Sequence, residues 1–214
     1  MYDVLIVGCG ITGAATAFML SKFQLKVGIL ERENDVSEGA TKANSAILHA
    51  GYDPKPGTLM AKLNVRGAEL ARELCRQLDV PYRQCGSMVL AFSEGEKRTL
   101  QELLRRGEAN GVQNLKILSG EAVGKLEPAI SREVTAALLA PTAAVCSPWE
   151  LCLALAETAV QNGAELHLET EVQGICRKAG GYAVQTNRGI LETRFVVNAA
   201  GVFAEQVHNM VSAP

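Results

Sequence analysis

Residues 3–31, DVLIVGCGITGAATAFMLSKFQLKVGILE, decide the fold that we predict for this chain. The apolar residues 4–7 are typical of a buried parallel strand, and they run directly into the pattern Gly8-Cys9-Gly10-Ile11-Thr12-Gly13. A helix is expected next, and then a second strand over residues 26–30. A strand, a GxGxxG turn, a helix and a second strand in this order predict a βαβ unit that binds a dinucleotide.

Each glycine of the turn has a separate role in that prediction. Gly8 permits the tight turn out of the strand, Gly10 lets the backbone approach a pyrophosphate, and Gly13 lets the helix pack closely on the sheet. The phosphates are expected at the N-terminus of the helix, where Ile11 and Thr12 follow the second glycine. The alternative is a glycine-rich turn that binds nothing, and the complete strand–turn–helix–strand context argues against it.

Glu31 narrows the choice of nucleotide. It ends the second strand, where a carboxylate can accept hydrogen bonds from both hydroxyl groups of an adenosine ribose. A carboxylate there disfavours a 2′-phosphate, so NADP is not expected. NAD and FAD both have a free ribose diol, so both are possible nucleotides at this point. Arg32, the next residue, is also expected to bind the cofactor.

Composition excludes several classes of protein. The chain has 214 residues, of which 48% are hydrophobic and 21% charged, with a net charge of −2, so nucleic acid is not an expected partner. Six cysteines form no CxxC or histidine-associated pattern, and we expect no metal site. No signal peptide or membrane-spanning run is apparent, which predicts a cytoplasmic protein with peripheral membrane association left open.

The pattern of elements predicts three segments along the chain. Residues 1–80 and 144–214 are expected to form the nucleotide domain, and residues 81–143 a substrate-side α+β insertion. A helix is expected from Thr58 to about Leu78, with Leu63 and Leu70 on the face that packs on the sheet. Residues 165–194 predict a strand and a three-stranded meander, after which residues 195–200 return to the core sheet. Because this core strand comes so late, we expect the chain to be an N-terminal fragment.

The polar segment after Glu31 favours a cofactor larger than NAD. In a simple NAD-binding unit the chain enters the next helix quickly, but here residues 32–46 are irregular. They carry Thr41, Asn44 and Ser45, which are groups able to bond a second part of a cofactor, and His49 follows.

Segments in a fixed order resemble a known family. These are the GxGxxG stretch with Glu31, then GATKANSAILHAGY, PGTLMAKLNVRG, QCGSMVLAF, APTAAVCSPWEL and VVNAAG. Together they resemble the FAD-dependent oxidoreductases of the D-amino-acid oxidase and glycerol-3-phosphate dehydrogenase superfamily, and within it L-2-hydroxyglutarate dehydrogenases most. The resemblance implies an α/β fold, namely an FAD-binding domain of the glutathione-reductase type with a β-meander and an inserted α+β substrate domain.

The same resemblance implies the cofactor, FAD, and the residues that hold it. Val172 matches a residue whose backbone meets the adenine, and Ala200 and Gly201 match a small pair that closes on the dinucleotide. The full set of expected cofactor-binding residues is Gly8, Gly10, Ile11, Thr12, Gly13, Glu31, Arg32, Thr41, Asn44, Ser45, Ala46, His49, Val172, Ala200 and Gly201.

Catalytic candidates lie together just after the polar segment. His49 is the best candidate base, but it is equally interpreted as a loop histidine that bonds backbone, or as a site of covalent flavin attachment. Lys55 is a candidate partner for a substrate anion, and the ordinary alternative is a solvated lysine in a turn. Tyr52 is a candidate for the pocket wall, and the ordinary alternative is packing in the protein interior. Ala50 and Asp53 depart from the serine and tyrosine of close relatives, which puts the substrate in doubt.

These observations predict an FAD-dependent dehydrogenase or oxidase of a small 2-hydroxy acid, with L-2-hydroxyglutarate first and glycerol 3-phosphate as the alternative. Hydride would pass to flavin N5, and the electron acceptor is left open. Two alternatives of another class are a non-catalytic dinucleotide-binding fragment and a plain NAD-dependent dehydrogenase.

Overall fold

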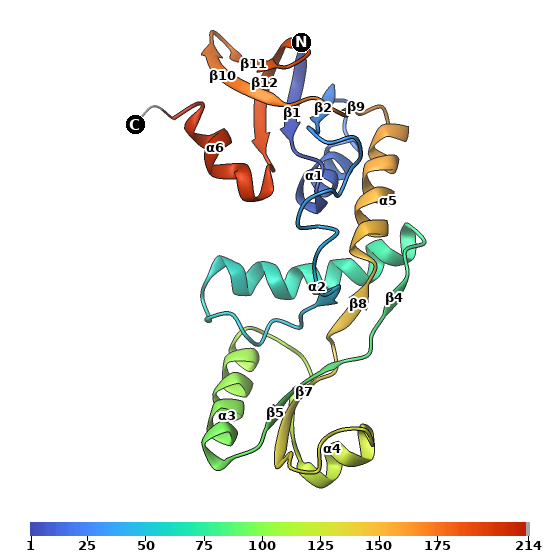
Figure 1. The fold of residues 1–214 in the computed structure, drawn as a ribbon, viewed down its shortest axis with the longest axis vertical. Helices are drawn as coiled ribbons and strands as arrows, with labels where there is room; N and C mark the ends of the chain where they lie inside the picture. The colour runs from blue at the N-terminus through green and yellow to red at the C-terminus, as the bar shows by residue number, and fades with distance from the viewer. Residues whose placement is uncertain (213–214) are drawn as a thin grey trace. The chain divides into compact units, whose positions relative to one another are not determined.

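The computed structural model describes residues 1–212 and divides the chain into two compact units (Figure 1). Unit 1 consists of Met1–Ser45 together with the chain from Ser147 onward, and unit 2 of Ala46–Cys146. The last two residues of the expected segment 144–214 lie outside the described residues. Mixed helices and a partly parallel sheet confirm the predicted α/β class.

Unit 1 is built on one sheet of six strands. Its strands are β1 (Tyr2–Val7), β2 (Val27–Leu30), β9 (Glu165–His167), β10 (Val172–Lys178), β11 (Gly181–Thr186) and β12 (Gly189–Asn198). Their order across the sheet is β10-β11-β12-β1-β2-β9. The four strands from β12 to β9 are parallel, whereas β10, β11 and β12 form an antiparallel meander.

The meander and the core sheet share a strand, which differs from the predicted arrangement. Residues 195–200 were expected to form a separate strand after the meander, but β12 runs without interruption over Gly189–Asn198. Thr193 is the junction, since it is paired both with Tyr182 of β11 and with Tyr2 of β1. No glycine or proline interrupts the chain between residues 190 and 198, so the strand passes from one pairing to the other without a turn.

Helices cover both faces of this sheet, as its continuous apolar strands require. On one face α1 (Ile11–Leu20) packs against α5 (Pro148–Gln161), and Ile6 of β1 points towards α1 at Gly13. On the other face Leu5 and Val7 join a buried cluster with residues of the meander and of α6 (Ala204–Asn209), which follows the short 3₁₀ helix η1 (Gly201–Phe203). The end of β1 is therefore enclosed between two layers.

Unit 2 contains two small antiparallel sheets and three helices. The sheets are β3 (Ile47–Leu48), β8 (Ala144–Cys146) and β4 (Tyr82–Arg83), in that order, and β5 (Ser87–Ala91), β7 (Ala136–Ala140) and β6 (Lys116–Ser119). The helices are α2 (Leu59–Gln77), α3 (Glu94–Ala109) and α4 (Gly120–Leu126). In the part of the chain that the structure describes, no helix is both long and apolar enough to cross a membrane.

The boundary between the units differs from the expected division at residues 80 and 81. β3 pairs with β8, with Ile47 opposite Val145, and α2 contacts β4. Residues 46–80 therefore group with the inserted segment. The segment begins and ends on paired strands, and this non-local pairing has no signature in the local sequence.

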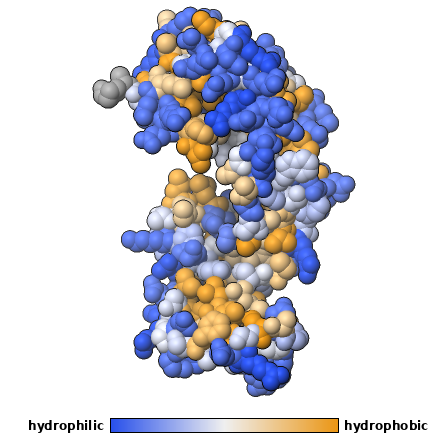
Figure 2. All heavy atoms as spheres, in the orientation of Figure 1, coloured by the Kyte–Doolittle hydropathy of each residue, from blue (hydrophilic) through white to orange (hydrophobic). Residues whose placement is uncertain are grey.

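Helix α2 buries a different face from the one that was predicted. Its buried residues are Ala61, Ala71 and Cys75, whereas Leu63 is 57% and Leu70 43% exposed. Other apolar side chains likewise reach the surface of the protein (Figure 2). Helical spacing identified the helix but could not tell which of its two apolar stripes is buried.

A side-chain network joins the edge strand β9 to the centre of the sheet. The Tyr2 hydroxyl donates to Glu165 Oε2 and lies 2.9 Å from His167 Nε2, and Lys26 Nζ is 3.1 Å from Glu165 Oε1. The Tyr2 ring reaches across β2 because Gly28 has no side chain, and a Cβ there would be 2.8 Å from Tyr2 Cε1. Tyr2 thus ties β1 to β9 over a glycine of β2.

Tyr2 predicts a loss of stability at alkaline pH. Burial, reinforced by Glu165, raises the pKa of Tyr2 to about 12, against about 10 in an unfolded chain. A raised tyrosine pKa means that the folded state favours the neutral phenol, so this contribution is present below about pH 10 and lost between about pH 10 and pH 12. We expect urea denaturation of Tyr2→Phe to show a shallower decline of stability across this window than the wild type. An identical decline in both proteins would contradict the assignment.

Candidate nucleotide-binding site

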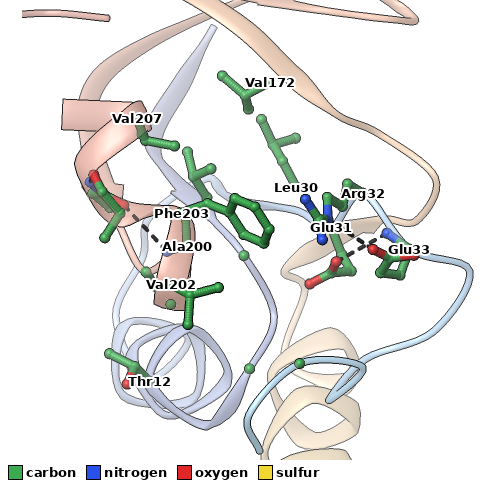
Figure 3. Close-up of a pocket in the computed structure, with 18 of the residues that line it drawn as sticks. Thr12, Leu30, Glu31, Arg32, Glu33, Val172, Ala200, Val202, Phe203 and Val207 are labelled. Carbon is green, nitrogen blue, oxygen red and sulfur yellow. Dashed lines mark hydrogen bonds and ion pairs between the residues drawn. The ribbon is translucent and has the colours of Figure 1, made fainter. Parts of the chain in front are cut away.

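A cavity of about 490 Å³ opens in unit 1 at the carboxyl ends of β1, β2 and β12 (Figure 3). Parallel sheets place ligands at this end of their strands, and the volume is in the range of small-molecule and cofactor sites. One side is lined by the glycine turn and the N-terminus of α1. The other is lined by β10, η1 and α6.

Two of the three glycines are required by close backbone contacts. Gly8 has a φ of +96°, and a Cβ there would be 2.6 Å from the carbonyl oxygen of Ala199 at the end of β12. A Cβ at Gly13 would be 1.9 Å from the carbonyl oxygen of Gly8, so the helix could not approach the turn. Gly10 instead lines the cavity, and a Cβ there would be 3.1 Å from the Thr41 hydroxyl oxygen.

Thr41 completes the start of α1. Gly10 caps the helix without a side chain, and the Thr41 hydroxyl accepts a hydrogen bond of 3.0 Å from the Ile11 N–H. Asn44 in turn donates to the Thr41 carbonyl oxygen at 2.7 Å and so fixes this loop. The amides in the first turn of a helix have no acceptors within the helix. In α1 these are the amide of Ile11, which Thr41 satisfies, and then the amides of Thr12 and Gly13. The cavity therefore begins at a helix N-terminus, which favours an anion.

The Glu31 carboxylate is held at the end of β2 by backbone amides. One oxygen accepts from Cys9 N at 2.7 Å and the other from Glu33 N at 3.0 Å, and the residue is only 8% exposed. Each oxygen of a carboxylate has a second acceptor position, so both can still receive a hydroxyl hydrogen. Glu31 lines the cavity, and these two acceptor positions are what the predicted contact with two ribose hydroxyl groups requires.

The far part of the cavity is lined by aliphatic side chains and contains a cation–π pair. Leu30, Val172 and Val207 contribute aliphatic side chains, and the guanidinium carbon of Arg32 lies 4.0 Å from the centre of the Phe203 ring (Figure 3). The sequence analysis did not identify Phe203 or Val207. The only signal was an aromatic residue two positions beyond VVNAAG, which has no motif of its own.

The cavity brings together most of the predicted cofactor-binding residues, and their binding role stays a prediction. Its lining includes Gly8, Gly10, Ile11, Thr12, Glu31, Arg32, Thr41, Val172, Ala200 and Gly201. Five are not part of this lining. Gly13 is buried beneath the turn, Asn44 and Ser45 lie further along the loop, and Ala46 and His49 belong to unit 2.

The catalytic candidates His49, Tyr52 and Lys55 all belong to unit 2. His49 and Lys55 are exposed, whereas Tyr52 is half-buried and packs against the clusters around Ala140 and Leu138. Their segment is anchored by Asn110, whose side chain donates to the carbonyl oxygens of Gly51 and Pro54. Tyr52 thus has a packing role, and the catalytic role of all three remains a prediction.

The sequence matches the family described as DAO, FAD dependent oxidoreductase, over residues 3–214. The chain is 49% identical over 212 residues to the glycerol 3-phosphate dehydrogenase of Caloramator mitchellensis, a match that covers 99% of this chain and 44% of that protein. It is 34% identical to the glycerol 3-phosphate oxidase of Mycoplasma pneumoniae, covering 99% and 57%. It is 30% identical to the human mitochondrial L-2-hydroxyglutarate dehydrogenase, covering 98% and 48%.

Solved structures give the same result for the fold. The dithionite-reduced L-α-glycerophosphate oxidase of M. pneumoniae with FAD bound superposes with a TM-score of 0.92 at 33% identity, covering 98% of this chain and 56% of that one. Glycine oxidase of Geobacillus kaustophilus superposes with a TM-score of 0.88 at 28% identity, covering 98% and 58%. The chain spans about half the length of these relatives.

The bond between Thr41 and the helix N-terminus predicts a specific loss of stability. Thr41→Val removes the acceptor of the Ile11 N–H, and leaving a partly buried donor unsatisfied costs about 1–3 kcal/mol. Thr41→Ser retains the hydroxyl and is the matched control. We expect urea denaturation of the ligand-free chain to show the loss for valine and less than half of it for serine. Equal losses would indicate that packing of the threonine methyl, rather than the hydrogen bond, accounts for the effect.

Proposed function

The chain belongs to the DAO family of FAD-dependent oxidoreductases, and on this premise we propose that it forms the FAD-binding part of an enzyme that oxidises glycerol 3-phosphate. The observation that carries this proposal is the 49% identity, over 99% of the chain, to a glycerol 3-phosphate dehydrogenase. L-2-hydroxyglutarate, which sequence motifs favoured first, becomes the second candidate because the identity to the human enzyme is 30%.

The chemistry of the cavity supports FAD as the occupant. The pyrophosphate would lie at the N-terminus of α1, where Gly10 has no side chain and the amide of Thr12 would donate. Glu31 would accept from the ribose hydroxyl groups of the adenosine, with its orientation fixed by Cys9 N and Glu33 N. Val172 would meet the adenine through its backbone, and Ala200 and Gly201 would close the opposite wall. The remaining loop residues, from Thr41 to Ala46, would follow the cofactor chain towards the flavin.

Bound FAD supplies a hydride acceptor, and residues of this chain would prepare the substrate for it. Glycerol 3-phosphate and L-2-hydroxyglutarate share a secondary hydroxyl and an anionic end. We propose that a ring nitrogen of His49 takes the hydroxyl proton and that Lys55 binds the anion by a charge-assisted hydrogen bond. Covalent attachment of the flavin to His49 is the alternative role of this side chain. The relatives include both a dehydrogenase and an oxidase.

Flavin reduction by each substrate under anaerobic conditions tests the proposed function. We expect glycerol 3-phosphate to bleach the bound flavin at least tenfold faster than L-2-hydroxyglutarate at equal concentration. Glycerol, which lacks the anion, is the control and should be slower still. Bleaching by L-2-hydroxyglutarate alone would make the second candidate correct. Bound flavin that neither acid reduces would support the alternative class, a nucleotide-binding module without activity of its own.

His49 can be tested in the same assay. A general base contributes about 10²- to 10⁴-fold to the rate, so His49→Gln should slow flavin reduction by that factor. Its FAD content should equal that of the wild type, and acid should release the flavin from both proteins. His208→Gln changes an exposed histidine of unit 1 and should leave the rate unchanged. Flavin that stays with the acid precipitate of the wild type, but not of His49→Gln, would contradict the general-base role. It would show instead that His49 is covalently linked to the flavin.

A further inference from the structure

The cation–π pair Arg32–Phe203 joins two chain segments that are far apart in sequence. Arg32 is the second residue after β2, and Phe203 ends η1, yet both line the same cavity (Figure 3). The guanidinium carbon is 4.0 Å from the ring centre, which is a cation–π distance. The pair therefore connects the β2 side of the cavity to the side formed by η1 and α6.

The orientation of Arg32 is fixed by a second contact. Its Nε donates to Glu33 Oε1 at 2.8 Å, and Glu33 N is in turn bonded to Glu31 Oε1. The guanidinium is thus held against the Phe203 ring by the same turn that orients the Glu31 carboxylate. The Arg32 side chain is 43% exposed and is part of the cavity lining, so these contacts do not enclose it.

The surroundings of the pair suit a planar aromatic base. Leu30 and Val172 lie at the same end of the cavity, at the end of β2 and the start of β10, and their aliphatic side chains offer no charge. A spacing of 4.0 Å leaves no room for a third layer between guanidinium and ring. An adenine base would therefore pack on the face of the Arg32 guanidinium that does not contact Phe203. Arg32 follows Glu31 in the chain, and the Glu31 carboxylate would hold the ribose of the same nucleotide.

We propose that Arg32 and Phe203 form a clasp for the adenine of the cofactor, and that this clasp makes the site select an adenine dinucleotide over FMN. The inference rests on the proposed FAD site and adds to it a residue, Phe203, that no motif identified. A guanidinium is planar and can stack on an aromatic ring and a base at once. An ammonium group cannot, so lysine at position 32 would not replace arginine.

Equilibrium titrations of four proteins with three ligands test the clasp. The proteins are the wild type, Phe203→Leu, Phe203→Tyr and Arg32→Lys, and the ligands are FAD, ADP and FMN. We expect Phe203→Leu to weaken FAD and ADP about tenfold while FMN is unchanged. Phe203→Tyr retains the ring and should bind all three as the wild type does. Arg32→Lys retains the charge and should nevertheless resemble Phe203→Leu.

The outcomes separate the clasp from general stability and from the proposed function. Unchanged FAD and ADP affinity in Phe203→Leu and Arg32→Lys would overturn the clasp, as would an equal loss for FMN. Thermal unfolding of the ligand-free variants shows whether Phe203→Leu is folded. If Phe203→Leu is unfolded, the titrations of Arg32→Lys decide the outcome, because position 32 is exposed. A wild type that binds NAD but neither FAD nor ADP would overturn the proposed function and the clasp with it. Wild-type FAD binding without the expected variant effects would overturn the clasp alone.

Discussion

The buried carboxylate of Glu31 is the constraint on which the cavity depends. A carboxylate that is 8% exposed must be hydrogen-bonded, and its two oxygens receive the amides of Cys9 and Glu33. The first bond fixes the glycine turn against the end of β2, and the second bends the chain after β2. The backbone of Glu31 is also held from β9 and its following turn, by His167 O and Thr170 N. The position of the glycine turn, and of the cavity wall that it forms, therefore depends on one side chain and its neighbours.

Local patterns predicted the elements of the fold well. The βαβ unit appears as predicted because a strand, a glycine turn and a helix each have a short-range signature. Thr58 likewise begins a helix as predicted, since its hydroxyl accepts from the amide three residues further on. What could not be predicted depends on distant pairing. Ile47 lies opposite Val145, and this pairing moves the boundary of the inserted unit away from residue 80.

The candidate site divides in the same way. Gly8, Gly10 and Glu31 belong to a motif, and the structure brings these three residues to one cavity. Phe203 has none, because an aromatic residue after a core strand is ordinarily part of a core, and its contact with Arg32 arises only from the tertiary fold. His49, Tyr52 and Lys55 lie in the other unit, so their catalytic roles rest on the sequence alone.

The visible absorbance spectrum of the purified chain, before and after addition of FAD and removal of the excess, tests the central claim most directly. The account predicts a yellow protein with flavin absorbance that stays with the chain through gel filtration and passes into the supernatant after acid precipitation. A protein that stays colourless after addition of FAD, yet binds NAD tightly, would contradict the claim that this cavity is built for a flavin dinucleotide.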